Sequence, residues 1–331
     1  MVLIYFRRLV QFLFFALFVL IFLRTTLHGE NDTEPWATFF FDIDPLVLLS
    51  TWLASASVLP KMFLALIVVG VTLLFGRVFC GWVCPLGTLF NFISVCRKAR
   101  PAHWIQTGTW NRGQKAKYLL LIGLLVCSLC GLHLVGIFDP LPFLYRTFAT
   151  SIYPAFNWGA DALFTWLYET DFGIGPARVT VVSEPIYSFL RAYVLPPNPK
   201  PYSGGVLIGL LFILVAILAL MRFRFWCRYI CPLGALLGLC SKTSRLDLHN
   251  NVEKCDHCKL CVAYCHGACD PHLADEWKKD ECLLCFNCRK QCPNGAISFR
   301  WSWFGRSMEI IHPLPSKKSK RINENEQESE E

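Results

Sequence analysis

Four apolar runs constrain this chain before any other feature of its sequence. They lie at 9–23, 60–76, 118–138 and 203–221, and about 17 to 25 apolar residues cross a lipid bilayer as a helix. The mean hydropathy of the chain is +0.41, so the statistics of soluble domains do not apply. We therefore predict an all-α membrane bundle of four transmembrane helices.

Basic residues fall on one side of this four-span arrangement. They are Arg7, Arg8, Arg77, Arg97, Lys98, Arg100, Arg112, Lys115, Lys117, Arg222, Arg224, Arg228, Lys242 and Arg245. The positive-inside rule makes this side the cytoplasm. The sequence thus predicts a multi-pass protein of the bacterial inner membrane, in contact with the lipid bilayer, with both termini cytoplasmic. The formal charge of +8 then reflects topology rather than binding of nucleic acid.

A motif with two cysteines recurs after the second and fourth runs. Its copies are Arg77-Val-Phe-Cys80-Gly-Trp-Val-Cys84-Pro-Leu-Gly and Arg224-Phe-Trp-Cys227-Arg-Tyr-Ile-Cys231-Pro-Leu-Gly. Asp-Pro-Leu also recurs, at 44–46 and 139–141, where Asp and Pro suit the first positions of a helix. We predict two tandem two-helix repeats, 1–100 and 115–246, within a transmembrane domain over 1–246. Because each repeat holds two spans, a pseudo-two-fold axis should run along the membrane normal.

Eight further cysteines form two runs with the spacing C-x2-C-x2-C-x3-C. In this bacterial pattern the fourth cysteine of each run binds the other of two [4Fe–4S] clusters. One cluster is then held by Cys255, Cys258, Cys261 and Cys292, and the other by Cys282, Cys285, Cys288 and Cys265. We predict an α+β 2[4Fe–4S] ferredoxin-like domain over 247–303. A charged, largely disordered tail over 304–331 should follow.

Zinc and haem are the alternatives for these cysteines. Zinc sites usually place a longer loop between cysteine pairs than these dense triplets do. Covalent haem needs C-x2-C-H, whereas Cys261-x3-Cys265-His266 has another spacing. Non-covalent haem needs axial ligands from the spans, where His133 is the one histidine. We therefore expect two [4Fe–4S] clusters and no haem, and Cys269 stays unassigned.

The C-x3-C-P pairs lie where a span meets the cytoplasm. Four thiolates brought together by the two-fold axis, Cys80, Cys84, Cys227 and Cys231, could bind an additional iron–sulfur cluster. Each pair could instead cycle between dithiol and disulfide, or the four could be small buried residues at tight turns. Duplicated cysteines beside duplicated Pro-Leu-Gly favour a metal or redox role over packing.

Three residues near the outer end of the third run are candidate catalytic residues for a quinol. His133, Asp139 and Arg146 would supply a base, an acceptor and a cation. The bland alternatives are a polar side chain between helices for the histidine and a helix cap for the aspartate.

The combination of four spans, two inner C-x3-C-P motifs and a C-terminal two-cluster module resembles the NapH family of membrane ferredoxin-type quinol dehydrogenases. That family is related to the electron-transfer core of NosR and more distantly to CcoG. The resemblance covers the chain from Arg7 to about Arg300. It implies a quinol dehydrogenase subunit that oxidises membrane quinol and relays electrons through 4Fe–4S clusters toward a periplasmic reductase system.

The resemblance also implies a partner, which would be another redox protein such as an iron–sulfur or multihaem cytochrome subunit. The outer loops are too short for the flavin domain of NosR or the outer domain of CcoG. Two other functions stay open at this point: a CcoG-like metal reductase or maturation factor, and an electron-wire subunit without a substrate of its own.

Overall fold

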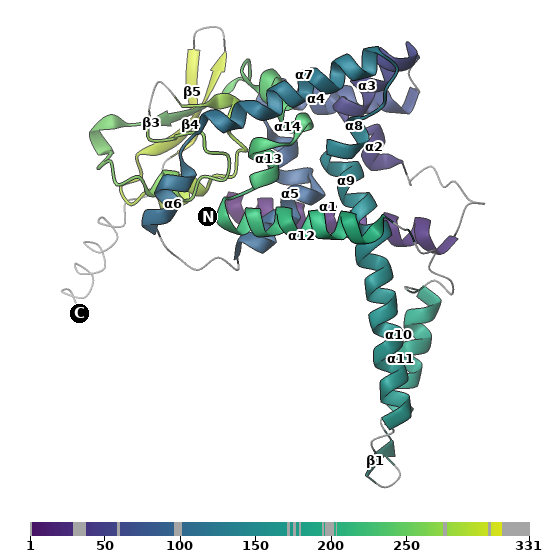
Figure 1. Cartoon of the computed structure of the whole chain (residues 1–331). Helices are drawn as coiled ribbons and strands as arrows, with labels where there is room; N and C mark the ends of the chain where they lie inside the picture. The colour runs from purple at the N-terminus through teal and green to yellow at the C-terminus, as the bar shows by residue number, and fades with distance from the viewer. Residues whose placement is uncertain are drawn as a thin grey trace, which may run out of the picture.

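The protein is mostly helical, with its strands gathered near the C-terminal end (Figure 1). This computed structural model describes residues 2–28, 38–57, 60–95, 101–170, 173–174, 177–178, 180–193, 195, 202, 204–273, 277–303 and 306–312. The main elements of the first repeat are α1 (Val2–His28), α2 (Phe39–Asp42), α3 (Pro45–Ser55), α4 (Leu64–Phe75), the π-turn η3 (Phe79–Val83) and α5 (Pro85–Val95). A short helix, α6 (Pro101–Gly108), follows.

The second repeat follows a similar order of elements. They are α7 (Ala116–Leu129), α8 (Val135–Phe138), α9 (Pro140–Thr147), the π-turn η5 (Phe148–Ile152), α10 (Tyr153–Thr170), α11 (Thr180–Tyr193), α12 (Gly205–Met221), α13 (Phe225–Tyr229) and α14 (Pro232–Ser241). Three of them, η5, α10 and α11, are added before α12. The helices that follow the two Cys-Pro pairs, α5 and α14, each pack on both repeats: α5 on α1, α9 and α12, and α14 on α7, α3 and α4. This exchange of partners is what a two-fold relation between the repeats produces.

The leucines of the repeated tripeptides form the centre of the main core. Leu46 and Leu141 of the Asp-Pro-Leu copies, and Leu86 and Leu233 of the Cys-Pro-Leu copies, are all buried. Proline at the first helical position fixes where each short helix begins. The following leucine then points inward from the first turn. The repeated tripeptides therefore place four helix N-termini around one interior region.

The apolar runs form helices of unequal length. Among the described residues, α1 is the one helix that is long and apolar enough to cross a membrane, and the second and fourth runs form shorter apolar helices. The third run is not a single helix, because α7 ends at Leu129 and Gly131 takes φ +80°, as glycines that terminate helices do. Cys130 and His133 thus lie beyond the helix that holds Cys127. The bundle of four spans stays a prediction.

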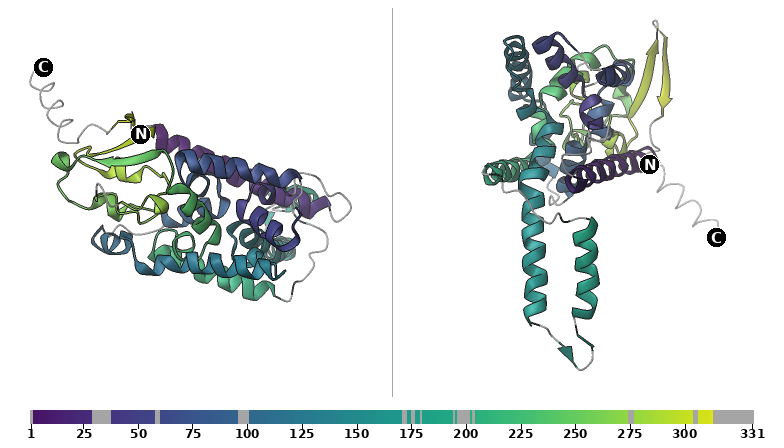
Figure 2. Two further views of the ribbon diagram at one scale, coloured as in Figure 1. Left: turned by 90° about the horizontal axis from the view of Figure 1, so that it is seen from above. Right: turned by 90° about the vertical axis from the view of Figure 1, so that its right-hand side faces the viewer.

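The C-terminal module contains a three-stranded antiparallel sheet of β3 (Leu246–Asn250), β4 (Ile297–Trp303) and β5 (Arg306–Ile311), in the order β3-β4-β5. It lies at one end of the helical body (Figure 2, left). The predicted tail begins too early, because β5 pairs with β4 and Ile311 packs on the module's core. The charged composition after 312 concealed this last strand. Residues 313–331 of the predicted tail lie outside the described residues.

A helical hairpin projects from the opposite end of the body. It consists of α10 and α11, joined through the short pair β1 (Gly173–Ile174) and β2 (Ala177–Arg178), and it runs crosswise to α1 and α12 (Figures 1 and 2). Asp161 accepts a hydrogen bond of 2.8 Å from the Tyr187 hydroxyl.

Candidate iron–sulfur centres

The first predicted ligand set lines one small pocket of the C-terminal module. Cys255, Cys258, Cys261 and Cys292 all border it, although Cys292 belongs to the other cysteine run. His272 lies beside them, and burial lowers the pKa of its imidazole. The structure thus brings together four thiols that the spacing rule assigns to one cubane.

The second predicted set is more deeply buried. It consists of four cysteines that are each no more than 8% exposed: Cys265, Cys282, Cys285 and Cys288. The first three lie close enough to Cys288 for a negative charge on any of them to raise the pKa of its thiol. Cys269 lies against this set, since its sulfur is 3.4 Å from that of Cys265. The sequence pattern assigned Cys269 no role, and a position outside the spacing rule gives no signal of this closeness.

The two cysteine runs wind in the same way. His257 and Lys259 in the first run have φ +50° and +56°, and Leu284 and Phe286, at the equivalent positions of the second run, have φ +47° and +57°. Positive φ is uncommon for residues other than glycine, and backbone strain of this kind gathers at functional sites. The matched conformations show a duplicated loop that is shaped for its thiols.

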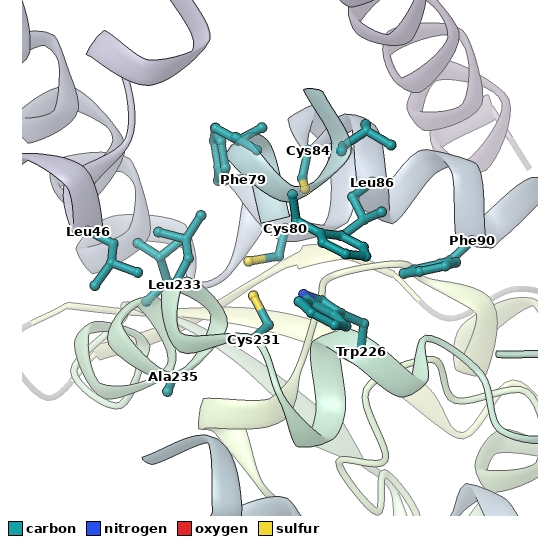
Figure 3. Close-up of a cluster of buried hydrophobic side chains, with 14 of the residues drawn as sticks. Leu46, Phe79, Cys80, Cys84, Leu86, Phe90, Trp226, Cys231, Leu233 and Ala235 are labelled. Carbon is teal, nitrogen blue, oxygen red and sulfur yellow. The ribbon is translucent and has the colours of Figure 1, made fainter. Parts of the chain in front are cut away.

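The four cysteines of the C-x3-C-P motifs meet in the interior. Cys80, Cys84, Cys227 and Cys231 are all buried, and Figure 3 shows the sulfurs of Cys80 and Cys231 turned toward each other from opposite repeats. The Cys231 sulfur accepts a hydrogen bond of 3.2 Å from the Gly234 N–H at the start of α14. Such N–H bonds to sulfur also tune bound iron–sulfur clusters. The two-fold arrangement predicted from the repeat therefore creates one four-cysteine centre.

Two arginines cross between the repeats at this centre. A Cβ built on Gly234 would lie 2.8 Å from Nη2 of Arg77, and one built on Gly87 would lie 3.3 Å from Nη1 of Arg224. The glycine of each Pro-Leu-Gly thus makes room for the guanidinium of the other repeat. Arg224 itself takes φ +50°, a costly conformation that directs its side chain inward.

The donors around the four-cysteine centre test whether it suits a cluster. Nε and Nη2 of both Arg77 and Arg224, and Nε1 of Trp226, are buried and have no hydrogen-bond partner within the described part of the chain. Buried N–H groups without an acceptor are costly, whereas a thiolate-bound iron–sulfur cluster is anionic and its sulfurs accept hydrogen bonds. The residues therefore fit a cluster. Across those same described residues, no group of three or more His, Cys, Asp or Glu side chains is arranged for a single metal ion.

Both C-x3-C-P loops press directly on the second ligand set of the module. The Trp82 indole donates a hydrogen bond of 3.1 Å to the carbonyl of Leu284. From the other repeat, the Arg228 guanidinium donates to the carbonyls of Cys265 and His266, at 2.6 and 2.9 Å. The residues between each pair of C-x3-C-P cysteines thus hold the loops that carry Cys265 and Cys285. The four-cysteine centre is therefore in direct contact with the set of Cys265, Cys282, Cys285 and Cys288, which we call the inner ligand set.

Replacing Gly81 with alanine should separate these loops. A Cβ at Gly81 would overlap the carbonyl oxygen of Leu283, which is backbone and cannot rotate away. Overpacking of this kind costs about 1 to 3 kcal/mol. We expect Gly81→Ala to lower the melting temperature and change the electron paramagnetic resonance (EPR) spectrum of the inner cluster. Gly123→Ala in α7 is the matched control, because a Cβ there meets nothing within 4 Å; equal effects of the two variants would contradict the close packing.

A buried ion network ties the module to the helices. Glu281, which precedes Cys282, pairs with Arg77 at 3.2 Å and also with Lys117, and all three side chains are at most 2% exposed. The backbone carbonyl of Asp280 accepts a second bond from Arg77, at 2.9 Å. Apart from the repetition of Arg77 at Arg224, no sequence pattern marks these residues as functional, because a long-range ion pair leaves no local pattern.

The three candidate quinol residues do not converge. The side chains of His133 and Arg146 are exposed, whereas Asp139 is fully buried. A different polar residue, Asp44, lies next to Asp139 instead. The structure therefore separates the predicted base and cation from the predicted acceptor.

Comparisons with known proteins associate the C-x3-C-P regions with iron–sulfur binding. A family model described as a 4Fe-4S binding domain matches residues 59–103 and 204–250, which contain the two C-x3-C-P motifs. An uncharacterized protein of Methanocaldococcus jannaschii is 27% identical over 91% of this chain and 97% of its own length. The ferredoxin-type protein NapH of Haemophilus influenzae is 26% identical over 71% of this chain and 66% of its own length.

Larger proteins share the same region. The regulatory protein NosR of Pseudomonas aeruginosa is 24% identical over 80% of this chain, which corresponds to 28% of NosR. No solved structure matches the chain. The resemblance inferred from the motifs is confirmed.

Proposed function

We propose that this chain, which resembles the NapH- and NosR-related ferredoxin-type proteins, is a membrane-bound electron relay that oxidises quinol and delivers electrons to a partner redox protein. The observation that carries the proposal is the contact between the four-cysteine centre and the inner ligand set through Trp82 and Arg228. Three sets of four cysteines then follow one another from the helical body to the outer edge of the module.

The bound clusters would supply one-electron redox chemistry at Cys80, Cys84, Cys227 and Cys231 and at the two ligand sets of the module. The surrounding residues shield two of these sites from water, since the thiols of the four-cysteine centre and of the inner ligand set are buried. Cys258, by contrast, is exposed. The outermost set is therefore the one that a cytoplasmic partner could reach.

A cleft between the helices and the module suits a quinol. Its volume is about 780 Å³, within the range of about 300 to 1,000 Å³ that is usual for small-molecule sites. Tyr118, Asp280 and lysines form its polar wall, and Leu119, Ile122 and Leu239 form its apolar wall. A quinol has a polar head and an apolar tail, which matches this division. Glu281 also lines the cleft, one residue before the cluster ligand Cys282.

Oxidation of a quinol to a quinone releases two electrons and two protons. Asp280 is placed to receive a proton, because its Oδ2 accepts a hydrogen bond of 3.2 Å from the Tyr118 hydroxyl at the cleft wall. The inner ligand set beside Glu281 would receive one electron, and the four-cysteine centre in contact with that set would receive the other. This geometry favours the inner cleft over the outer positions of His133 and Arg146 as the quinol site.

The proposed topology follows the positive-inside rule. With four spans, the C-terminal module faces the cytoplasm and the hairpin of α10 and α11 lies at the outer surface of the inner membrane. The electrons would pass to a further iron–sulfur or multihaem subunit and onward to a periplasmic reductase system.

A reduced menaquinol analogue should bleach the visible absorbance of the oxidised protein in nanodiscs. Asp280→Asn should slow this bleaching roughly 100-fold, the size of a general-base contribution, whereas His133→Ala should leave the rate within about twofold. The reverse pattern would move the quinol site to the outer end. If no quinol bleaches the protein while dithionite reduces every cluster, the quinol function is wrong and a maturation or metal-reductase function takes its place.

A further inference from the structure

The two aspartates of the repeated Asp-Pro-Leu motif form a pair in the interior. Asp44 precedes α3 and Asp139 precedes α9, and both side chains are 0% exposed. Their carboxyl groups lie within hydrogen-bonding reach of each other. One residue comes from each repeat, so the pair sits on the same two-fold relation as the four-cysteine centre.

The pair has few other partners. Oδ1 of Asp44 accepts the N–H of Leu46 at 2.8 Å, which is the expected helix cap. Oδ2 of Asp44 and both carboxyl oxygens of Asp139 are buried, and none has a hydrogen-bond donor among the described residues. Capping thus accounts for one oxygen of the four. For the other three, the second carboxyl group and the backbone N–H of Leu141, which faces Asp139, are the neighbouring polar groups.

The surroundings of the pair are apolar. Four of the helices that pack on α3 or α9 contain no ionisable side chain, namely α4, α5, α8 and α12. The remaining titratable or charged groups on the packed elements are Asp42, Lys61, Lys117, Tyr118, Cys127, Cys240, Tyr145 and Arg146, and the Lys61 side chain is exposed. Lys117 and Tyr118 bind the module, Asp42 binds Thr38, and Tyr145 binds Thr25. Cys80 of the four-cysteine centre lies in the same buried cluster as Leu46 and Leu141, the leucines of the two Asp-Pro-Leu copies, and a charge on Cys80 acts on Asp139.

Two carboxylates in contact, buried and without a cation, cannot both be ionised. The pair therefore holds at least one proton, shared between the two repeats. A negative charge that arrives at Cys80 and its neighbours raises the affinity of the pair for a second proton, because the added repulsion disfavours the remaining carboxylate.

We propose that Asp44 and Asp139 form a proton-binding site that is coupled to the redox state of the four-cysteine centre. The inference rests on the proposed cluster at that centre. When one electron derived from quinol arrives there, the carboxyl pair binds one proton from water, and the charge of the interior is unchanged. When the electron leaves for the partner protein, the proton is released. The repeated Asp-Pro-Leu motif thus serves proton uptake as well as helix capping.

The test is a redox titration of the four-cysteine centre at several pH values between about pH 6 and pH 9, followed by EPR. Uptake of one proton per electron lowers the midpoint potential by about 59 mV per pH unit, the equivalent of a tenfold change in proton concentration for one electron. In Asp139→Asn and Asp44→Asn the potential should become independent of pH. Infrared difference spectra should show a protonated carboxyl band that changes on reduction and is lost in both variants.

Asp42→Asn is the matched control, because Asp42 lies two residues from Asp44 and pairs with Thr38; it should keep the wild-type slope. The module's clusters provide an internal reference for correct folding in every variant. A flat wild-type titration, or a slope that survives Asp139→Asn, overturns the proton site while leaving the relay intact. Absence of any third cluster from the wild-type protein would overturn both proposals.

Discussion

Changing Cys80 and Cys231 together to serine will lower the iron content of anaerobically purified protein from about twelve to about eight atoms per chain, by the stoichiometry of three and two cubane clusters. The two thiols lie on opposite repeats and face each other at the four-cysteine centre (Figure 3). Serine keeps the size of the side chain but binds iron poorly. The loss should therefore be confined to this centre.

Iron and acid-labile sulfide analysis, together with EPR of the reduced protein, measures this change. The matched control is the double variant Cys127→Ser/Cys130→Ser, because these cysteines belong to the third apolar run and no centre contains them. It should retain about twelve iron atoms. A wild-type content of about eight atoms would show that the C-x3-C-P cysteines hold no cluster, and a preparation that contains only zinc would contradict every iron–sulfur assignment.

Replacing Glu281 with glutamine will destabilise the attachment of the module by about 3 to 5 kcal/mol, the usual cost of removing one member of a buried ion network. The carboxylate of Glu281 neutralises two buried cations, Arg77 and Lys117. Glutamine preserves the shape of the side chain but leaves both positive charges without a counter-ion. The expected result is a large fall in the temperature at which the visible iron–sulfur absorbance is lost.

Two further variants define the origin of that effect. Asp161→Asn removes an ion pair between two exposed side chains, Asp161 (38% exposed) and Arg191 (51% exposed). This variant should lower the free energy of unfolding by less than about 1 kcal/mol. Adding Lys117→Met to Glu281→Gln removes one of the unpaired cations and should restore part of the lost stability. A melting temperature in Glu281→Gln equal to that of Asp161→Asn would show that the network carries no such energy.

The local motifs of this chain could be interpreted without a structure. The spacing of Cys255, Cys258 and Cys261 puts their thiols in one short loop, so the sequence itself identifies them as a ligand set, and the crossed partner Cys292 follows from the pattern of such domains. The repeated Cys-Pro-Leu-Gly likewise predicts a helix start and a duplicated site. Such predictions are possible because the relevant atoms are neighbours along the chain.

The end of α7 shows where such reasoning fails. Apolar residues continue through 118–138, so hydropathy predicts one span, but the backbone turns at Gly131 and the helix stops at Leu129. Hydropathy reports the polarity of side chains and is insensitive to a left-handed backbone residue. His133 consequently occupies an exposed segment rather than a helix face.

The charged interior of the protein was decided by tertiary structure alone. Arg77 reaches Glu281 across 204 positions of the chain, Arg228 holds Cys265, and Asp44 meets Asp139. Each of these residues looks in the sequence like a topological marker, a loop residue or a helix cap. Its role depends on which buried charge lies opposite, and that is set by how the two repeats and the module pack. The sequence by itself determined the duplication and predicted the ligands, because both patterns are local. The structure determined the electrostatic environment of these cysteines, because burial and opposite charge are properties of the assembled fold.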